Sequence, residues 1–283
     1  MMFPRPIETR STLAQTLYKF AVPLALIIWL LPLLAVMLTS IRSGGDINAG
    51  NYWGWPTSFN FMENYSAVFK NSPIAEYIFN SFKITIPTVA LTLALSCLTG
   101  YALAIYKFRA GTWLFFLFVA GNFVPFQILM VPVRDFSVRT GLYDTVTGLV
   151  LFHAAFQTGF CTLFMRNFIK ALPFDLIEAA RVEGVSEGRI FWYVVMPLMH
   201  PAIAALAVLI FTFIWNDYFW ATVLVQSNHA MPVTAGLKTL NGQWIAQWQL
   251  ISAGSMVAAL PPVLMFFLMQ RHFIAGLTLG AVK

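Results

Sequence analysis

The sequence predicts an all-α integral membrane protein with six transmembrane helices. Hydrophobic residues make up 59% of the chain and charged residues 10%, with a mean hydropathy of +0.74. A chain this apolar does not stay soluble as a globular domain. Uncharged apolar runs long enough to cross a bilayer also recur along the chain, separated by polar segments. We therefore expect one transmembrane domain over residues 1–283, embedded in a lipid bilayer.

The first span is expected over residues 20–41. A basic arm, residues 1–19, precedes this uncharged run. The run is too long for the apolar core of a signal peptide, and no small-residue cleavage site follows it. We therefore expect an uncleaved first helix that stays in the membrane.

The second and third spans are expected over residues 84–106 and 112–133. The segment before them, residues 42–81, is polar and aromatic without an excess of positive charge, so it predicts an extracytoplasmic loop. A short amphipathic helix is expected within that loop near residues 62–69. The third span contains Pro125 together with polar residues in the middle of the membrane.

The last three spans are expected over residues 145–165, 202–226 and 250–269. A second extracytoplasmic loop, residues 227–249, joins the fifth span to the sixth. The sixth span carries a Pro-Pro pair, which implies a kink or break. Such a break is tolerable only if other groups satisfy the carbonyls that the prolines leave free.

The distribution of positive charge sets the orientation of the spans. Most Lys and Arg residues fall on the side that holds both termini and the segment 172–201, whereas the opposite side has fewer of them across longer loops. The positive-inside rule therefore places both termini and this segment in the cytoplasm, in a multi-pass membrane protein. The formal charge of +6 is scattered beside apolar spans and forms no continuous stripe, so nucleic acid is not an expected partner.

Residues 172–201 form the most structured charged segment between two spans. Pro173 suits the first turn of a helix, and Gly184 suits the left-handed residue that ends one. We therefore expect a short helix over residues 173–183. Ser186 then offers the N-cap of a second helix, which is expected to run until Pro197 interrupts it.

This segment resembles the EAA loop of ATP-binding-cassette (ABC) importer permeases, and we call residues 172–201 the EAA loop. The resemblance rests on an EAA triplet, an acid-Gly pair three residues later, and a proline-containing stretch before the next span. It implies the type I ABC importer permease fold, in which this loop forms a cytoplasmic coupling helix that seats in a cleft of the ATPase. The alternative is an ordinary amphipathic loop. The implied coupling residues are Glu178, Ala179, Ala180, Glu183, Gly184 and Pro197.

The C-terminal tail, residues 270–283, is similar to that of carbohydrate-importer permeases, which typically reads basic-x-Phe, Gly-Leu-Thr, then small residues and Val-Lys. The likeness is to the maltose-type permease that lacks a large periplasmic insertion. In that permease the tail extends into the interface between two ATPases. It implies the same contact here for Gly276, Leu277, Thr278 and Lys283. The alternative is a frayed terminus.

The sequence offers no catalytic or metal-binding constellation. It contains no G-x-x-x-x-G-K-[ST] phosphate loop, paired carboxylates, His-rich ligand spacing or nucleophile elbow. The two cysteines lie in apolar segments and suggest buried hydrophobic side chains. We therefore expect no enzyme and no cofactor in this chain, with ATP and Mg²⁺ bound by a separate ATPase.

Polar residues inside the expected spans are candidates for the translocation path. Asp217 is the only acid well inside an apolar span, where an ionised carboxylate is costly unless it faces water or a partner. A structural acid within the helix bundle is an equally good interpretation of Asp217, and the amides could instead join helices. Clustered aromatic rings beside Asp217 could stack on a sugar. The candidates are Asn122, Gln127, Gln157, Trp215, Asn216, Asp217 and Trp220.

We interpret the chain as the permease subunit of an ATP-driven bacterial importer for a sugar, a polyol or a sugar derivative. The resemblance implies a second homologous permease, two ATPase subunits and a periplasmic or lipid-anchored solute-binding protein. The alternative is an ion-coupled secondary transporter that uses Asp217. Such a transporter works without ATP and usually has two repeated halves, and the sequence shows no repeat of this kind. A membrane-embedded enzyme would need a catalytic constellation at the membrane surface.

Overall fold

The computed structural model describes residues 11–241 and 246–279, and within these ranges it contains helices and one isolated β-bridge but no strand. The chain divides into two compact units, Met1–Ser72 with Thr239–Val257 and Pro73–Lys238 with Ala258–Lys283. Five described helices are long and apolar enough to cross a membrane, or six if one bent pair counts as a single span. The all-helical membrane architecture expected from the sequence is confirmed.

The first unit holds α1 (Thr12–Ser40), α2 (Gly44–Asn48) and α3 (Phe61–Asn71). α3 matches the short helix expected near residues 62–69. The connection from α2 to α3 is tied down by polar contacts. The buried Arg42 guanidinium donates to the carbonyls of Asn51 and Gly54, and Asp46 accepts from the backbone N–H and the hydroxyl of Thr57. The Thr57 hydrogen bonds hold the pKa of Asp46 below its usual range.

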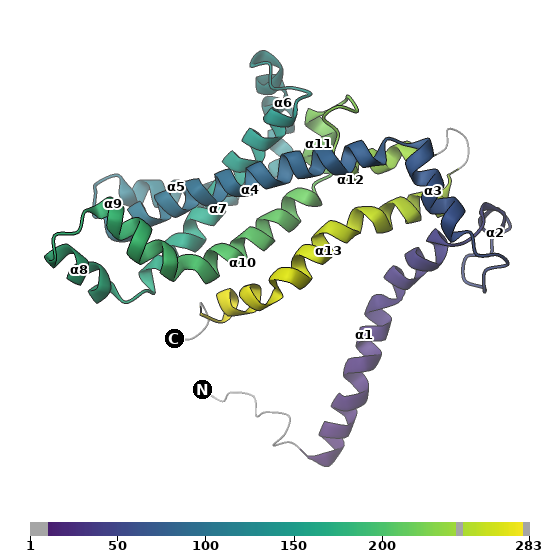
Figure 1. Cartoon of the computed structure of the whole chain (residues 1–283), viewed down its shortest axis with the longest axis horizontal. Coiled ribbons are helices and arrows are strands. Elements are labelled where there is room, and N and C mark those ends of the chain that lie inside the picture. The colour runs from purple at the N-terminus through teal and green to yellow at the C-terminus, as the bar shows by residue number, and fades with distance from the viewer. Residues whose placement is uncertain (1–10, 242–245, 280–283) are drawn as a thin grey trace. The chain divides into compact units, whose positions relative to one another are not determined.

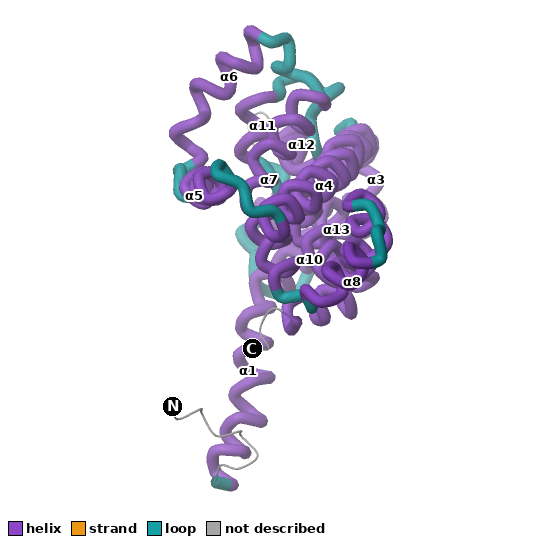
Figure 2. The backbone as a smooth tube through the Cα atoms, turned by 90° about the vertical axis from the view of Figure 1, so that its left-hand side faces the viewer, coloured by secondary structure: helices purple, strands orange, loops and turns teal. Residues whose placement is uncertain are grey.

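Three long helices form the core of the second unit: α4 (Ile74–Ile105), α7 (Val146–Lys170) and α10 (Met196–Trp215). They lie side by side, as Figures 1 and 2 show. The backbones of α4 and α7 approach closely at Gly100, where an added Cβ would lie 2.9 Å from the Cβ of Met165. The Thr99 and Thr162 hydroxyls share a hydrogen bond of 2.6 Å across the same contact. A small residue and paired hydroxyls therefore join these two helices.

The third span expected over residues 112–133 is interrupted in the structure. α5 (Gly111–Asn122) is followed by a 3-10 turn, Phe126–Leu129, and then by α6 (Met130–Arg139). The axis bends by 95° between Gly111–Asn122 and Phe126–Arg139, and Figure 2 shows α6 turning away from α5. Pro125 explains the break, because it lacks an N–H and its ring pushes the preceding residue out of helical geometry.

The fifth span expected over residues 202–226 is also interrupted. α10 ends at Trp215, and a separate short helix, α11, covers Phe219–Leu224. Asp217 lies in the break and not inside a continuous helix. Its carboxylate accepts the N–H groups of Trp220 and Ala221 at 3.2 and 2.9 Å, so it caps α11. A carboxylate that satisfies two free N–H groups stabilises a new helix start at this point.

Pro197 does not end the second helix of the EAA loop, contrary to expectation. α9 (Glu187–Ile190) continues through a π-helical turn, Phe191–Val195, directly into α10. Pro197 is the second residue of α10, which directly follows this π-helical turn. The wider turn takes up the change in hydrogen bonding that a proline would otherwise impose.

The remaining helices are α8 (Phe174–Val182) and α12 (Val233–Gly236) of the second unit and α13 (Trp248–Leu279), of which the residues up to Val257 belong to the first unit and those from Ala258 to the second. α8 belongs to the EAA loop, and α12 packs against α4. α13 runs without a break through Pro261 and Pro262, so the interruption that the sequence suggested there does not occur. The indole Nε1 of Trp215 donates to the Ala258 carbonyl at 3.0 Å and supplies a donor that the prolines cannot.

Candidate functional site

A cavity of about 740 Å³ opens in the second unit beside the break between α10 and α11. Side chains of α5, α7 and the break line it together with the start of α11, so both helix interruptions described above help to form it. Its volume lies in the range that small-molecule sites occupy. The lining residues are Asn122, Phe126, His153, Phe156, Gln157, Phe160, Thr212, Phe213, Asn216, Asp217, Tyr218, Phe219 and Trp220.

Asp217 supplies the carboxylate of this cavity. Besides capping α11, its Oδ2 lies 3.5 Å from Nε2 of His153, which comes from α7 and is buried. The Asp217 backbone carbonyl accepts the hydroxyl of Thr234. These contacts hold the carboxylate between two helices, so its position is fixed before any solute arrives.

The amides give the cavity its hydrogen-bonding capacity. Asn122 and Asn216 each donate to a backbone carbonyl one helical turn earlier, Phe118 and Thr212, which leaves their amide oxygens as acceptors. The half-buried Gln157 amide has no hydrogen-bond partner among the described residues. Aromatic walls with a few amides suit a hydroxylated ring, which can stack on the rings and bond through its hydroxyls.

Five of the seven pathway residues proposed from the sequence line this one cavity: Asn122, Gln157, Asn216, Asp217 and Trp220. The other two lie elsewhere. Trp215 is 1% exposed and packs in the core, and Gln127 lies in the 3-10 turn outside the cavity. His153 is not among the residues proposed from the sequence, because its place beside Asp217 depends on two residues that are far apart in the chain.

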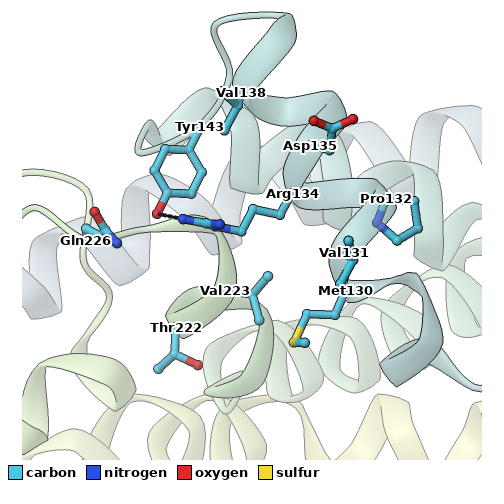
Figure 3. Close-up of a pocket in the computed structure, with 10 residues that line it drawn as sticks. All are labelled: Met130, Val131, Pro132, Arg134, Asp135, Val138, Tyr143, Thr222, Val223 and Gln226. Carbon is cyan, nitrogen blue, oxygen red and sulfur yellow. Dashed lines mark hydrogen bonds between the residues drawn. The ribbon is translucent and has the colours of Figure 1, made fainter.

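A second cavity, of about 930 Å³, lies between α6 and α11 (Figure 3). Arg134 extends across it toward Tyr143, and its guanidinium lies 5.1 Å from the centre of the tyrosine ring. The next residue, Asp144, adopts φ 58°. Its Oδ1 accepts the N–H groups of Gln226 and Ser227, both at 2.8 Å. Burial opposes ionisation of Asp144, but these two bonds outweigh it and lower its pKa.

The EAA loop presents an exposed helix. α8 covers Phe174–Val182 with Pro173 as its N-cap, close to the expected bounds, and Gly184 takes the expected left-handed φ of +77°. Glu178 and Ala179 are exposed. Val182 is 89% exposed, and the apolar side chains of Phe174 and Leu176 are also on the surface. An exposed helix that carries apolar side chains next to an acid is typical of a docking surface.

Four side chains, which we call the Glu187 clamp, join the EAA loop to the end of α4. The Arg181 guanidinium donates to Oε1 and Oε2 of Glu187 at 2.7 and 3.2 Å. Oε2 also accepts the hydroxyls of Tyr101 and Tyr106 at 3.1 and 2.8 Å. The bond to Glu187 raises the pKa of Arg181, so this cation stays charged. Glu187 is not among the coupling residues proposed from the sequence.

The remaining coupling residues proposed from the sequence lie at the ends of helices. Glu183 is the C-cap of α8, and Pro197 is in the first turn of α10. Gly276, Leu277 and Thr278 lie near the C-terminal end of α13, and Lys283 lies outside the described residues. The tail therefore continues the last helix at least to Leu279.

The known proteins that resemble this chain are membrane components of transport systems. Residues 95–278 match the family described as "Binding-protein-dependent transport system inner membrane component". The osmoprotective compounds uptake permease protein GgtD of Synechocystis sp. is 36% identical over 90% of this chain and 88% of its own length. The arabinooligosaccharides transport system permease protein AraQ of Halalkalibacterium halodurans is 34% identical over 89% of this chain and 90% of its own.

Solved structures show the same fold. A chain of a bacterial ABC transporter involved in the import of the acidic polysaccharide alginate superposes with a TM-score of 0.78 at 22% identity, covering 93% of this chain and 99% of that one. Membership of a family of transport components makes this chain a multi-pass permease and not an enzyme. The chain belongs to the inner membrane components of binding-protein-dependent transport systems, and it is an ABC transporter permease.

Proposed function

We propose that this chain is the permease subunit of an ATP-driven importer for a sugar, a polyol or a related derivative, with α8 docking on a separate ATPase. The observation that carries the proposal is the geometry of the EAA loop. α8 exposes Glu178 and an apolar surface, while the Glu187 clamp fastens the loop to α4. A rigid connection of this kind transmits movement of a docked partner to the spans.

The cavity beside Asp217 supports a place for the solute on the translocation path. Its aromatic walls and amides fit a neutral hydroxylated ring. The relatives named above are an uptake permease for osmoprotective compounds and a permease of an arabinooligosaccharide transport system, and this agrees with a sugar or polyol as the solute here.

The proposed assembly contains a second homologous permease, two ATPase subunits that bind ATP and Mg²⁺, and a periplasmic or lipid-anchored solute-binding protein. The family name supports the last of these partners, since it describes transport that depends on a binding protein. Both termini and the EAA loop are assigned to the cytoplasmic side, in agreement with the positive charge on that side of the sequence.

The test is to purify the tagged chain from native membranes, identify the subunits that accompany it, and measure uptake in proteoliposomes. A panel of labelled monosaccharides, disaccharides and polyols is offered with the purified binding protein, with and without internal ATP. The proposal requires uptake that depends on ATP and on the binding protein. Uptake driven by a proton or sodium gradient without ATP contradicts it and favours an ion-coupled role for Asp217.

A further inference from the structure

A third cavity, of about 620 Å³, lies where α4 ends and α5 begins. Three cationic side chains line it: Lys107 and Arg109 from the connection between these helices, and Arg166 from α7. No carboxylate of the described residues lines the cavity. None of the three cations forms an ion pair within the part of the chain that the structure describes. The cavity therefore concentrates positive charge that the residues described in the structure do not neutralise.

Arg166 is held in place at the wall of this cavity. Its Nε donates to the Leu103 carbonyl at 3.3 Å, and its guanidinium lies 4.1 Å from the centre of the Phe115 ring. Lys107 and Arg109 are exposed. The first turn of α5 also lines the cavity, and the positive end of that helix favours an anion there.

The position of the cavity indicates the kind of anion. Apolar helices end on either side of it, at Ile105 and Gly111, so the cations lie at the depth of the lipid head groups. Phe108 and Phe116 also line the cavity and are 42% and 56% exposed. Exposed apolar rings next to uncompensated cations suit a ligand with both an anionic head and an acyl chain.

We propose that this cavity binds the phosphate head group of one anionic phospholipid, with its acyl chains against the exposed phenylalanines. Arg109 and Arg166 can each donate two N–H groups to phosphate oxygens, and Lys107 adds a point charge. The Tyr106 hydroxyl donates to Glu187 at 2.8 Å, so the lipid belongs to the leaflet on the side of the EAA loop. The bound lipid lies next to the Glu187 clamp.

The test uses the full chain, purified in detergent with the subunits that accompany it. Phosphatidylglycerol or phosphatidylcholine is added at equal concentration, and bound lipid is counted by native mass spectrometry. We expect preferential binding of phosphatidylglycerol, reduced about tenfold in Lys107→Gln/Arg109→Gln. The matched control, Lys170→Gln/Arg189→Gln, removes the same charge at the same end of the bundle outside the cavity and retains binding. Lys107→Arg, which keeps the charge, also retains it.

Three results would overturn the proposal. Equal binding of phosphatidylcholine would show that the cations do not select the head group. Equal loss in the two double variants would show a general effect of net charge. Displacement of the lipid by the same concentration of glycerophosphoglycerol, the head group without acyl chains, would assign the cavity to a soluble phosphate compound. The thermal unfolding midpoint of each variant is measured alongside. If the double variant unfolds at a lower temperature than the native protein, the single variant Lys107→Gln is used instead. A several-fold loss of phosphatidylglycerol binding in that variant supports the proposal, and unchanged binding contradicts it.

Discussion

The indole of Trp215 donates its Nε1 hydrogen to the backbone carbonyl of Ala258 at 3.0 Å, and both residues are buried. This carbonyl has no normal helical partner, because the residues three and four positions later are Pro261 and Pro262. α13 therefore passes a Pro-Pro pair as a continuous helix because a side chain of α10 replaces the missing donor. The relationship also explains why Trp215 faces the core and not the solute cavity.

Trp215→Phe is expected to reduce the stability of the membrane domain by about 1–3 kcal/mol, since it leaves a buried carbonyl unpaired. Thermal unfolding in detergent can be followed by labelling of the buried thiols Cys97 and Cys161. Adding Pro262→Ala to Trp215→Phe restores a helical N–H to the Ala258 carbonyl and should recover part of the loss. Equal stability of native protein and Trp215→Phe would contradict this account.

Sequence patterns predicted the helix of the EAA loop well, because its ends depend on local chemistry. Pro173 and Gly184 fix where α8 begins and ends through backbone geometry that only nearby residues determine. The Glu187 clamp depends on two tyrosines at the C-terminal end of α4 that are more than eighty residues away. No local spacing signals a contact of that separation.

The helix breaks at Pro125 and Asp217 were harder to predict, because apolar residues continue on both sides of each. A span inferred from hydropathy alone reads through such a break. The cavity was predicted in part, since five of its residues were named from their polar or aromatic character inside the expected spans. Its walls come from helices whose breaks bring them together, and only the fold shows that.

Gly184 can be tested through its backbone conformation. An added Cβ would meet no atom within 4 Å, so a substitution at Gly184 acts only through the φ of +77°. Gly184→Val should distort the turn after α8, at a cost of about 1–2 kcal/mol, and reduce ATP-driven uptake severely. Gly184→Asn tolerates this φ and should retain most uptake. Normal uptake by the valine variant would count against a role for the turn in coupling.

Gln157 tests the role of the cavity in solute binding. Gln157→Leu keeps the side-chain size and removes the amide, and we expect the KM for solute to rise about tenfold, as the loss of one or two hydrogen bonds predicts. Gln127→Leu is the matched control, because Gln127 lies outside the cavity. Uptake kinetics in proteoliposomes distinguish the two. An equal effect of both variants would place the solute elsewhere.

Asp144 predicts a dependence of stability on pH. The Gln226 and Ser227 N–H groups lower the pKa of Asp144 in the folded protein. The ionised carboxylate therefore stabilises the fold fully above the unfolded pKa of about 4. This stabilisation is lost as the pH falls through the lower pKa of the folded state. Asp144→Asn accepts the positive φ but carries no charge. The unfolding midpoint of the native protein should exceed that of the variant at pH 7, and the difference should shrink below pH 4. A constant difference would contradict the assignment.

Docking of α8 on an ATPase is tested by comparing native protein with Glu178→Ala in the same proteoliposomes, with ATP hydrolysis and solute uptake measured together. Glu178 is exposed on α8, so its removal should leave the fold intact. We predict that solute-stimulated hydrolysis and uptake fall together by at least about tenfold, while the thermal unfolding midpoint is unchanged. Unchanged hydrolysis and uptake in Glu178→Ala would contradict docking through α8.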